Sequence, residues 1–509
     1  MFPDAPGIPR LLGSFGTCAV ALALTYAHPA LAELRPWESG DPIPVFAKLL
    51  PASAPRVVES EDGQLTAAAP VDASLTVAPA GPVDATLAAH PPGVPTALVD
   101  ADHRGMDAFY RKLALAEQGK GTARASQWGD STIAADGITS TVRARLQARF
   151  GNAGPGYLSA GMDPRWSVRQ DVVVTPHGEF ETVSLLLGGG GGRYGYGGIA
   201  TTVPAEGYFT VTGPKNPDGS RLVMKHFELW YQIGPERGDW WASVSGRGAG
   251  GGSAIAESTG DRWQTVDDTQ GFTSASAGAG KAGPVTFYGM VLETGGAGVV
   301  WDALGVVGVG ARSFTQQGRT HLNNQVAHRN PDLVVVMLGG NELGLPVLSK
   351  GDGSEYIPYY LEAVHRLRAG APRSSCLVVT PLDQGTRDGG SPRTKPNLPR
   401  AVAAMQKAAE QEGCAFWNAW TAMGGNGAVV RWAAMKPVLA WSDLLHLSSA
   451  GQDIIGQMLA DAIESGFDDW KSKGGAGRPP AIPPGPAPAV TPAPAPATGG
   501  APSPSKATL

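Results

Sequence analysis

The sequence predicts an α/β fold with a parallel sheet, joined to an all-β domain. After about residue 298, apolar runs of strand length alternate with helix-like stretches, which is the pattern of a parallel sheet covered on both faces. Residues 166–297 instead contain short alternating runs separated by Gly, Pro, Asn and Asp, as in a β-sandwich. Both ends of the 509-residue chain lack these periodicities and are rich in Ala and Pro.

The composition limits the classes of function. Hydrophobic residues make up 42% of the chain, enough for a sizeable core, whereas only 17% are charged. The net charge is −5 and no basic block is present, so a nucleic-acid or anionic-membrane partner has no electrostatic support. No CxxC or HxxxH spacing offers a metal site. We expect neither a metal nor an organic cofactor.

Residues 1–32 predict a secretory signal. Arg10 precedes an apolar run over residues 11–27, and Ala30-Leu31-Ala32 gives the small-x-small pattern of a cleavage site. An uncleaved anchor or a mistaken start site is the alternative, but Gly and Ser dilute the run, which makes it a poor membrane span. We therefore expect an exported protein, periplasmic or extracellular, with no membrane span after signal removal.

Two long segments are expected to be flexible spacers. Residues 33–100 are rich in Ala, Pro and Val with little periodicity. Residues 474–509 alternate Pro with Ala and carry only Arg478 and Lys506 as charged side chains. Such a composition favours an extended, solvated chain that cannot bury a core. Neither segment is expected to carry chemistry.

A helix is expected at residues 139–150. Val142, Leu146 and Phe150 recur there at four-residue spacing and share one face. The β segment that follows contains alternating runs at 207–211, 227–231 and 241–244.

Strands and helices then alternate to the end of the folded part. In a parallel sheet of this kind, active sites gather at the carboxyl ends of the strands. The expected strands are 333–338, 376–380 and 415–417, and the expected helices are 359–368, 398–412 and 448–467.

Two candidate site residues lie in loops next to predicted elements. Ser131, in Gly129-Asp130-Ser131, lies in a loop that leads to the first helix, where backbone N–H groups can face an incoming oxyanion. Asn341 follows the most apolar strand, and its amide can serve the same oxyanion. Taken alone, each residue is better explained as an ordinary structural one, Ser131 as a capping serine and Asn341 as a turn asparagine.

Asp443 and His446 form a third candidate segment, just before the last helix. A histidine three residues after an aspartate lets the carboxylate hold its Nδ1–H, which leaves Nε2 to act on a serine. An isolated Asp-x-x-His can equally be the solvated start of a helix.

The order serine, glycine, asparagine and Asp-x-x-His resembles the SGNH, or GDSL-type, hydrolase family. That resemblance implies a flavodoxin-like three-layer α/β/α fold. It also implies that Ser131 is the nucleophile, His446 the general base and Asp443 its orienting acid.

The same resemblance implies an oxyanion hole. Its donors would be the Ser131 backbone N–H, the Asn341 amide and the N–H of Gly310, with Gly308 as the rival glycine. Family members often carry aspartate where this chain has Glu342, a change that keeps the amide of Asn341.

The sequence between Ser131 and Gly310 is far longer than one helix and one strand require, so the β segment is expected to be an insertion. This arrangement resembles the bacterial peptidoglycan O-acetylesterases and O-acetyltransferases, which carry a carbohydrate-binding-module-like sandwich there. It implies a hydrolase domain in two parts, 101–165 and 298–473, around a jelly-roll-like sandwich at 166–297. Segments 146–156, 287–293, 301–305 and 422–425 carry the resemblance.

The resemblance implies an exported serine esterase whose partner is an O-acetylated cell-wall glycan, with peptidoglycan as the first candidate. Two alternatives stay open. The same acyl-enzyme can transfer the acetyl group to a sugar hydroxyl, or the chain can be a glycan-binding wall protein with an idle site. The intact set of Ser131, Asn341, Asp443 and His446 argues against the idle site. The oligomeric state is not predicted.

Some residues have two explanations. Cys376 and Cys414 each begin an apolar stretch, and they can form a disulfide between neighbouring strands or remain buried free thiols. The glycine-rich loops at 188–192 and 195–198 lack a following Gly-Lys-Ser/Thr, so sandwich loops are expected rather than a nucleotide site.

An aromatic set in the β segment can form either a sugar-stacking platform or core. Four histidines show no metal-ligand spacing and are expected to be structural. The aromatic residues are Trp230, Tyr231, Trp240 and Trp241, and the histidines are His226, His321, His328 and His365.

Overall fold

The computed structural model describes residues 57–59, 65–67, 92–100, 103–161, 163, 165–349, 352–387 and 391–480. In the N-terminal unit, residues 1–75, strands β1 (Val57–Glu59) and β2 (Leu65–Ala67) form an antiparallel pair. All other described elements belong to the second unit. The predicted signal and nearly all of the predicted C-terminal spacer lie outside the described residues.

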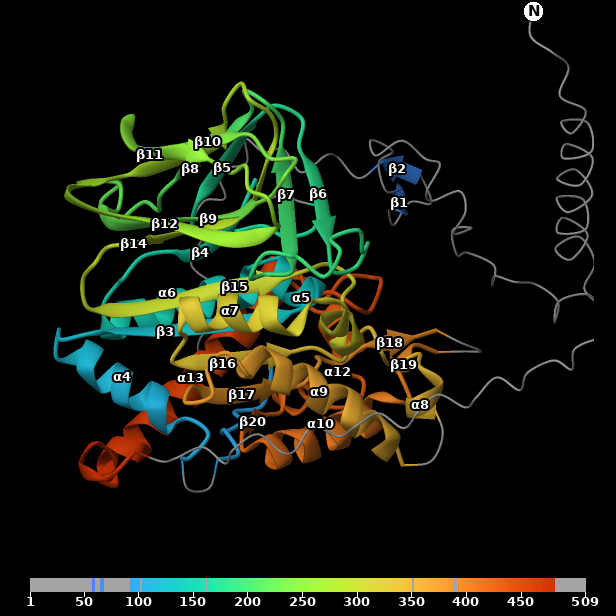
Figure 1. Ribbon diagram of the computed structural model, residues 1–509. Helices are drawn as coiled ribbons and strands as arrows, with labels where there is room; N and C mark the ends of the chain where they lie inside the picture. Colours follow the sequence, from blue (N-terminus) through green and yellow to red (C-terminus); the bar gives the residue numbers. More distant parts are fainter. Residues whose placement is uncertain are drawn as a thin grey trace, which may run out of the picture. The chain divides into compact units, whose positions relative to one another are not determined.

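A five-stranded parallel sheet forms the centre of the second unit (Figure 1). β3, the first of these strands in the chain, lies between the second and the third and pairs in parallel with both. This is the flavodoxin-like order, as the family resemblance implied. Across the sheet the strands are β15 (Gly298–Gly305), β3 (Thr122–Gly129), β16 (Leu333–Met337), β17 (Ser375–Val379) and β20 (Ala415–Trp417).

Helices cover both faces of this sheet, which confirms the three-layer fold (Figure 1). Successive residues of a strand point to opposite faces. In β16, Leu333 and Val335 therefore join the core beneath one set of helices, whereas Val334 and Val336 join the core beneath the other. The first set is α4 (Asp107–Glu117), α6 (Gly137–Phe150) and α13 (Ser449–Ser472), and the second is α7 (Arg319–Arg329), α9 (Ile357–Arg368) and α10 (Leu398–Glu412).

The expected helices are confirmed within two residues, except at the end of α13. That helix continues past the expected residue 467 because Phe467 and Trp470 also bury their rings against Tyr110 of α4. Shorter elements complete the unit: α5 (Ser131–Ala134), η2 (Ala311–Gln316), α8 (Pro346–Ser349), η3 (Ser354–Tyr356), β18 (Gly385–Thr386), β19 (Arg393–Thr394), α11 (Ala419–Met423), α12 (Ala428–Ala433) and η4 (Gly475–Gly477).

Two antiparallel sheets lie between α6 and β15 in the chain, and they form the inserted sandwich. Their inner faces share one core, in which Phe209 and Phe287 meet edge to face at 5.8 Å. One sheet has the order β11 (Arg247–Ser253), β10 (Asp239–Val244), β13 (Ser274–Ala279), β8 (Tyr208–Thr212), β5 (Val173–His177). The other has the order β12 (Gly260–Phe272), β9 (Met224–Ile233), β14 (Val285–Glu293), β7 (Ile199–Val203), β6 (Glu181–Ser184).

The sandwich begins earlier than the expected boundary at residue 166. Strand β4 (Gly156–Ser159), which the sequence assigned to the first hydrolase part, pairs with β14 in the six-stranded sheet. This strand has four residues and follows a glycine-rich turn, so it shows too little alternation to be recognised from the sequence.

The outer face of the six-stranded sheet packs against the α/β layers. Trp230 of β9 is fully buried there and contacts His328 of α7 edge to face at 5.0 Å. Glu293 of β14 pairs with Arg124 of β3 at 2.6 Å and with Arg329 of α7 at 2.7 Å. Buried aromatic and ionic contacts therefore hold the sandwich against the catalytic layers.

These contacts show that most of the aromatic set in the β segment belongs to the core and does not form a sugar-stacking platform. Trp230, Tyr231 and Trp240 are buried, as expected for core residues. Trp241 is partly exposed on the outer face of the other sheet, where its ring lies 5.5 Å from that of Tyr208.

The α/β part also begins earlier than expected. The N–H of Val99 donates to the carbonyl of Phe416 in β20 at 2.8 Å, and the indole of Trp417 donates to Thr96 O at 2.9 Å. Residues 92–100, assigned from composition to the flexible spacer, thus follow the exposed edge of β20. Pairing with a sheet edge depends on the backbone, which composition does not reveal.

Cys376 of β17 and Cys414, which precedes β20, form a disulfide. The sequence left the pair open between this and two free thiols. The bridge joins two neighbouring strands of the central sheet. In the described residues, no helix is long and apolar enough to cross a membrane.

Candidate active site

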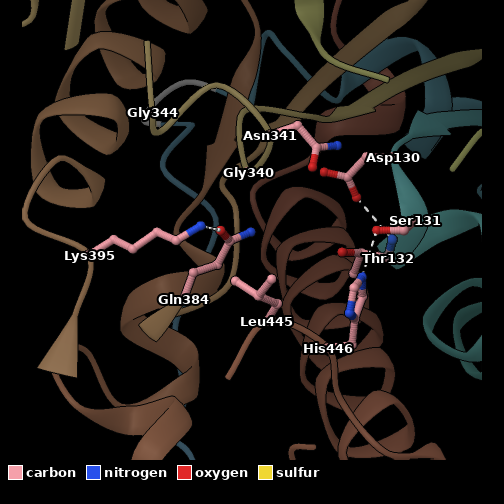
Figure 2. Close-up of a pocket in the computed structure, with 10 residues that line it drawn as sticks. All are labelled: Asp130, Ser131, Thr132, Gly340, Asn341, Gly344, Gln384, Lys395, Leu445 and His446. Atoms are coloured by element: carbon pink, nitrogen blue, oxygen red, sulfur yellow. Dashed lines mark hydrogen bonds between the residues drawn. The ribbon is translucent and has the colours of Figure 1, made fainter. Parts of the chain in front are cut away.

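Ser131, Asn341 and His446 line one pocket at the carboxyl ends of β3 and β16 (Figure 2). This edge is where the strand order reverses around β3, the usual position of a site in an open α/β sheet. A polar pocket opens there, lined by Asp130, Ser131, Thr132, Gly340, Asn341, Gly344, Gln384, Lys395, Leu445 and His446.

A tight turn places Ser131 at the first residue of the short helix α5. Asp130 caps this helix, and its carboxylate accepts the N–H of Thr132 at 2.9 Å. Gly129 must be glycine, because a Cβ there would lie 2.2 Å from Ile133. The Ser131 backbone N–H has no hydrogen-bond partner among the described residues, so it can serve an incoming oxygen.

Ser131, His446 and Asp443 form a hydrogen-bonded chain. Ser131 Oγ lies 3.0 Å from His446 Nε2, and His446 Nδ1 lies 2.7 Å from Asp443 Oδ2. In the tautomer that fits this chain, Nδ1–H donates to the carboxylate and Nε2 accepts the serine proton. The arrangement can therefore activate Ser131 as a nucleophile.

A strained turn holds Asp443 and His446 in place. Asp443 Oδ1 accepts the backbone N–H groups of Leu445 at 2.9 Å and His446 at 3.1 Å. Leu444, buried between them, has φ of 57°, a left-handed value that a leucine rarely adopts. Partial burial disfavours the charge on Asp443, but the hydrogen bonds from His446 and the two N–H groups dominate and lower its pKa.

Asn341 lies on the opposite side of the pocket from His446 (Figure 2). Its Nδ2 donates to Val309 O at 2.8 Å, which uses one of its two protons. This bond orients the amide and leaves the second proton for a ligand oxygen.

The two candidate oxyanion glycines differ in their hydrogen bonds. The Gly310 N–H, favoured from the sequence, donates to Ser313 Oγ at 3.1 Å, and Gly310 is buried. Gly308 is partly exposed, has φ of 80°, and its N–H has no partner within the described part of the chain. Neither glycine is among the residues that line the pocket, so Gly310 stays the predicted donor and Gly308 its rival. The sequence could not separate the two glycines, because both lie in the same glycine-rich run.

Glu342 has a structural role that the sequence did not indicate. Its carboxylate is buried and accepts the N–H of Ala311, and a Cβ on Gly310 would lie 2.5 Å from it. Burial raises the pKa of Glu342 to about 7; the Ala311 N–H opposes this shift, and the charge of Asp130 adds to it. Burial also raises the pKa of Asp130. Two buried carboxyl groups thus support the loops that carry Ser131 and Asn341.

Glu342→Gln is expected to become more stable than the parent chain as pH rises. Because the folded-state pKa of about 7 lies above the ordinary 4.5, the proton on Glu342 stabilises the fold fully below pH 4.5. That stabilisation is lost as pH rises through 7. At about 1.4 kcal/mol per unit of pKa, the glutamine variant should gain up to about 3 kcal/mol relative to the parent chain. Urea unfolding at pH 5 and pH 8 measures this. The exposed Glu355→Gln is the control, and a pH-independent difference for Glu342→Gln contradicts the prediction.

Gln384 and Lys395 also line the pocket, and the sequence did not indicate either. They flank the β18–β19 hairpin, and Lys395 Nζ lies 3.0 Å from Gln384 Oε1. Figure 2 shows them across the pocket from Ser131. No motif surrounds them, so only the folded hairpin identifies them as neighbours of the site.

The described residues contain no group of three or more His, Cys, Asp or Glu side chains that could hold a metal ion. The four histidines expected to be structural each pair with a carboxylate. His226 pairs with Asp267, His321 with Asp261, His328 with Glu228, and His365 with Glu412.

The profile of the GDSL-like lipase/acylhydrolase family matches residues 269–454. This range includes Asn341, Asp443 and His446, but Ser131 precedes it. The chain carries a GDSL-like acylhydrolase domain. Most of the inserted sandwich lies between Ser131 and the matched range, which begins within β12.

A solved structure of a peptidoglycan O-acetylesterase shares the fold of this chain. It is 22% identical, with a TM-score of 0.61, and the likeness covers 73% of this chain and 99% of that one. An acetyl xylan esterase matches with 16% identity and a TM-score of 0.24, over 32% of this chain and 80% of its own. A salicylyl acyltransferase from a tetracycline biosynthetic pathway matches with 12% identity and a TM-score of 0.26, over 61% and 96%. No curated protein sequence matches this chain.

Proposed function

We propose that this chain is an exported serine esterase that removes O-acetyl groups from a cell-wall glycan, peptidoglycan in the first place. The observation that carries the proposal is the chain of hydrogen bonds from Ser131 Oγ to His446 Nε2 and from His446 Nδ1 to Asp443. The Asn341 amide and the free Ser131 N–H face the same pocket.

In the acylation step, Ser131 Oγ attacks the acetyl carbonyl carbon while His446 Nε2 takes the hydroxyl proton. The carbonyl oxygen becomes an oxyanion, which the Ser131 N–H, the Asn341 amide and the N–H of Gly310, or of its rival Gly308, stabilise. His446 then gives its proton to the sugar oxygen as the carbon–oxygen bond breaks. The sugar alcohol leaves and the acetyl group remains on Ser131.

In the deacylation step, His446 takes a proton from water, the hydroxide attacks the acetyl-enzyme, and acetate leaves as Ser131 regains its proton. The exposure of the catalytic pair favours water as the acceptor. The side chains of His446 and Asp443 are 46% and 44% exposed. A dedicated acetyltransferase would instead need to exclude water from this intermediate.

Two observations support the proposed substrate and the proposed location outside the cytosol. The likeness to a solved peptidoglycan O-acetylesterase covers 99% of that chain and 73% of this one, which supports peptidoglycan as the first substrate to test. The disulfide between Cys376 and Cys414 suits an oxidising compartment outside the cytosol.

A panel of acetylated polymers tests the substrate. We expect the purified chain to release acetate from O-acetylated peptidoglycan faster than from acetylated xylan. Adding a glycan acceptor should leave acetate as the main product. A preference for acetylated xylan would mean that the substrate is a polysaccharide other than peptidoglycan. Acetyl groups on the acceptor in place of free acetate would identify a transferase.

Activity is expected to fall in acid through a single ionisation. His446 must be neutral to accept the serine proton, and a histidine ordinarily becomes charged between pH 8 and 5. The lowered pKa of Asp443 keeps its carboxylate ionised throughout that range. The measurement is kcat/KM for an aryl acetate from pH 8 to pH 5. Glu342→Gln should show the same fall in kcat/KM at low pH. That result would mean that His446, and not the buried carboxyl group, causes the fall. A profile that stays flat to pH 5 contradicts the role of His446.

A further inference from the structure

Trp441 lies two residues before Asp443, and its side chain is 53% exposed. Most tryptophans of the described chain are buried; Trp128, Trp301 and Trp417, for example, are completely inaccessible. A large aromatic side chain left in solvent forgoes the stabilisation that burial provides. The exposure of Trp441 therefore needs another explanation.

The backbone register places Trp441 next to His446. Ala440 and Leu447 form an antiparallel bridge, so Trp441 lies directly opposite His446, and its N–H donates to His446 O at 2.9 Å. Residues directly opposite each other in an antiparallel pair project from the same face, with Cβ atoms about 5 Å apart. Burial follows this alternation, since Ala440 and Leu447 are buried while Trp441 and His446 are exposed.

The chemistry of the ester defines what lies on this side of the pocket. His446 Nε2 must deliver its proton to the leaving oxygen, so the alcohol part of the ester extends from Ser131 toward His446. The group attached to that oxygen then reaches the cross-strand neighbour of His446, which is Trp441.

We infer that Trp441 binds the pyranose ring that carries the acetyl ester. The inference rests on the proposed function, which makes the leaving alcohol a sugar. A sugar ring presents C–H bonds on one face, and their partial positive charge suits the negative face of an indole. The loop is braced for this contact: Arg387 donates to Ser442 O at 2.8 Å, and the Gly385 N–H donates to Leu444 O at 2.7 Å.

The test compares Trp441→Ala, Trp441→Phe and the control Ile255→Ala, which removes a side chain of similar exposure from the sandwich. On O-acetylated glycan fragments, Trp441→Ala should raise KM about tenfold, and Trp441→Phe should recover most of that loss. With ethyl acetate, whose leaving group carries no ring that could stack on the indole, Trp441→Ala should keep kcat/KM within about twofold. Ile255→Ala should change neither.

Three results would overturn the inference. The first is an unchanged KM for the glycan fragments in Trp441→Ala. The second is an equal loss of activity on both substrates, which would mean that Trp441 only supports His446. Light scattering can also show that Trp441→Ala dissociates an oligomer, which would make the indole a subunit contact.

A binding measurement separates this inference from the proposed function. In the Ser131→Ala background, calorimetry with glycan fragments should show binding that Trp441→Ala weakens about tenfold. Trp441-dependent binding without any acetate release by the parent chain leaves the subsite standing and removes the esterase. Acetate release whose KM does not depend on Trp441 leaves the esterase standing and removes the subsite.

Discussion

Ser131→Ala is expected to reduce hydrolysis of an aryl acetate by about 10⁴–10⁶, to the background rate. The substitution removes the atom that attacks the carbonyl and that lies 3.0 Å from His446 Nε2. Ser131 is partly exposed at the start of a short helix, so its loss should leave the melting temperature nearly unchanged. Initial rates and thermal unfolding of the purified variant provide the measurement.

Ser140→Ala is the matched control for this variant. Ser140 is also a partly exposed serine near a helix start, on α6, and it does not line the pocket. We expect it to keep full activity. A Ser131→Ala chain that remains folded and active would show that another residue is the nucleophile.

Asn341→Ala is expected to lower kcat by about 10²–10³ with a much smaller effect on KM. The charge on the substrate oxygen exists only in the transition state and the tetrahedral intermediate, so a donor to it acts on kcat. Steady-state kinetics on the aryl acetate measures the split between the two constants.

The same variant also removes the bond from Asn341 to Val309 O, which can shift the glycine loop. Asn341→Asp separates these effects, since it keeps the shape of the side chain but replaces the donor by a charged acceptor. We expect it to be at least as impaired as the alanine variant. A loss below about tenfold in Asn341→Ala would make this residue a turn residue only.

Much of the site could be predicted because of how parallel sheets are built. Ser131 and Asn341 each follow a strand, and the carboxyl ends of parallel strands meet at one edge. Asp443 and His446 are close in sequence, so their pairing depends on a local turn. The structure brings Ser131, His446 and Asp443 into hydrogen-bond distance, as the order of the motifs indicated.

The remaining features depend on contacts that sequence periodicity does not encode. Trp230 has the alternation of a strand residue, but only the packing of α7 against its sheet shows that both faces are covered. Glu342 resembles an ordinary surface glutamate until its buried bond to Ala311 is known. Gln384 and Lys395 join the site through a hairpin that is distant in sequence from every motif.

The most direct test of the central claim is to look for the acetyl group on Ser131 during turnover. The chain is mixed with O-acetylated peptidoglycan, quenched in acid within the first turnovers, digested and analysed by mass spectrometry. The proposed mechanism predicts one acetyl group on the peptide that contains Ser131, its disappearance as acetate accumulates, and neither acetyl nor acetate with Ser131→Ala. Acetate release without this adduct, and with Ser131→Ala as active as the parent chain, would contradict it.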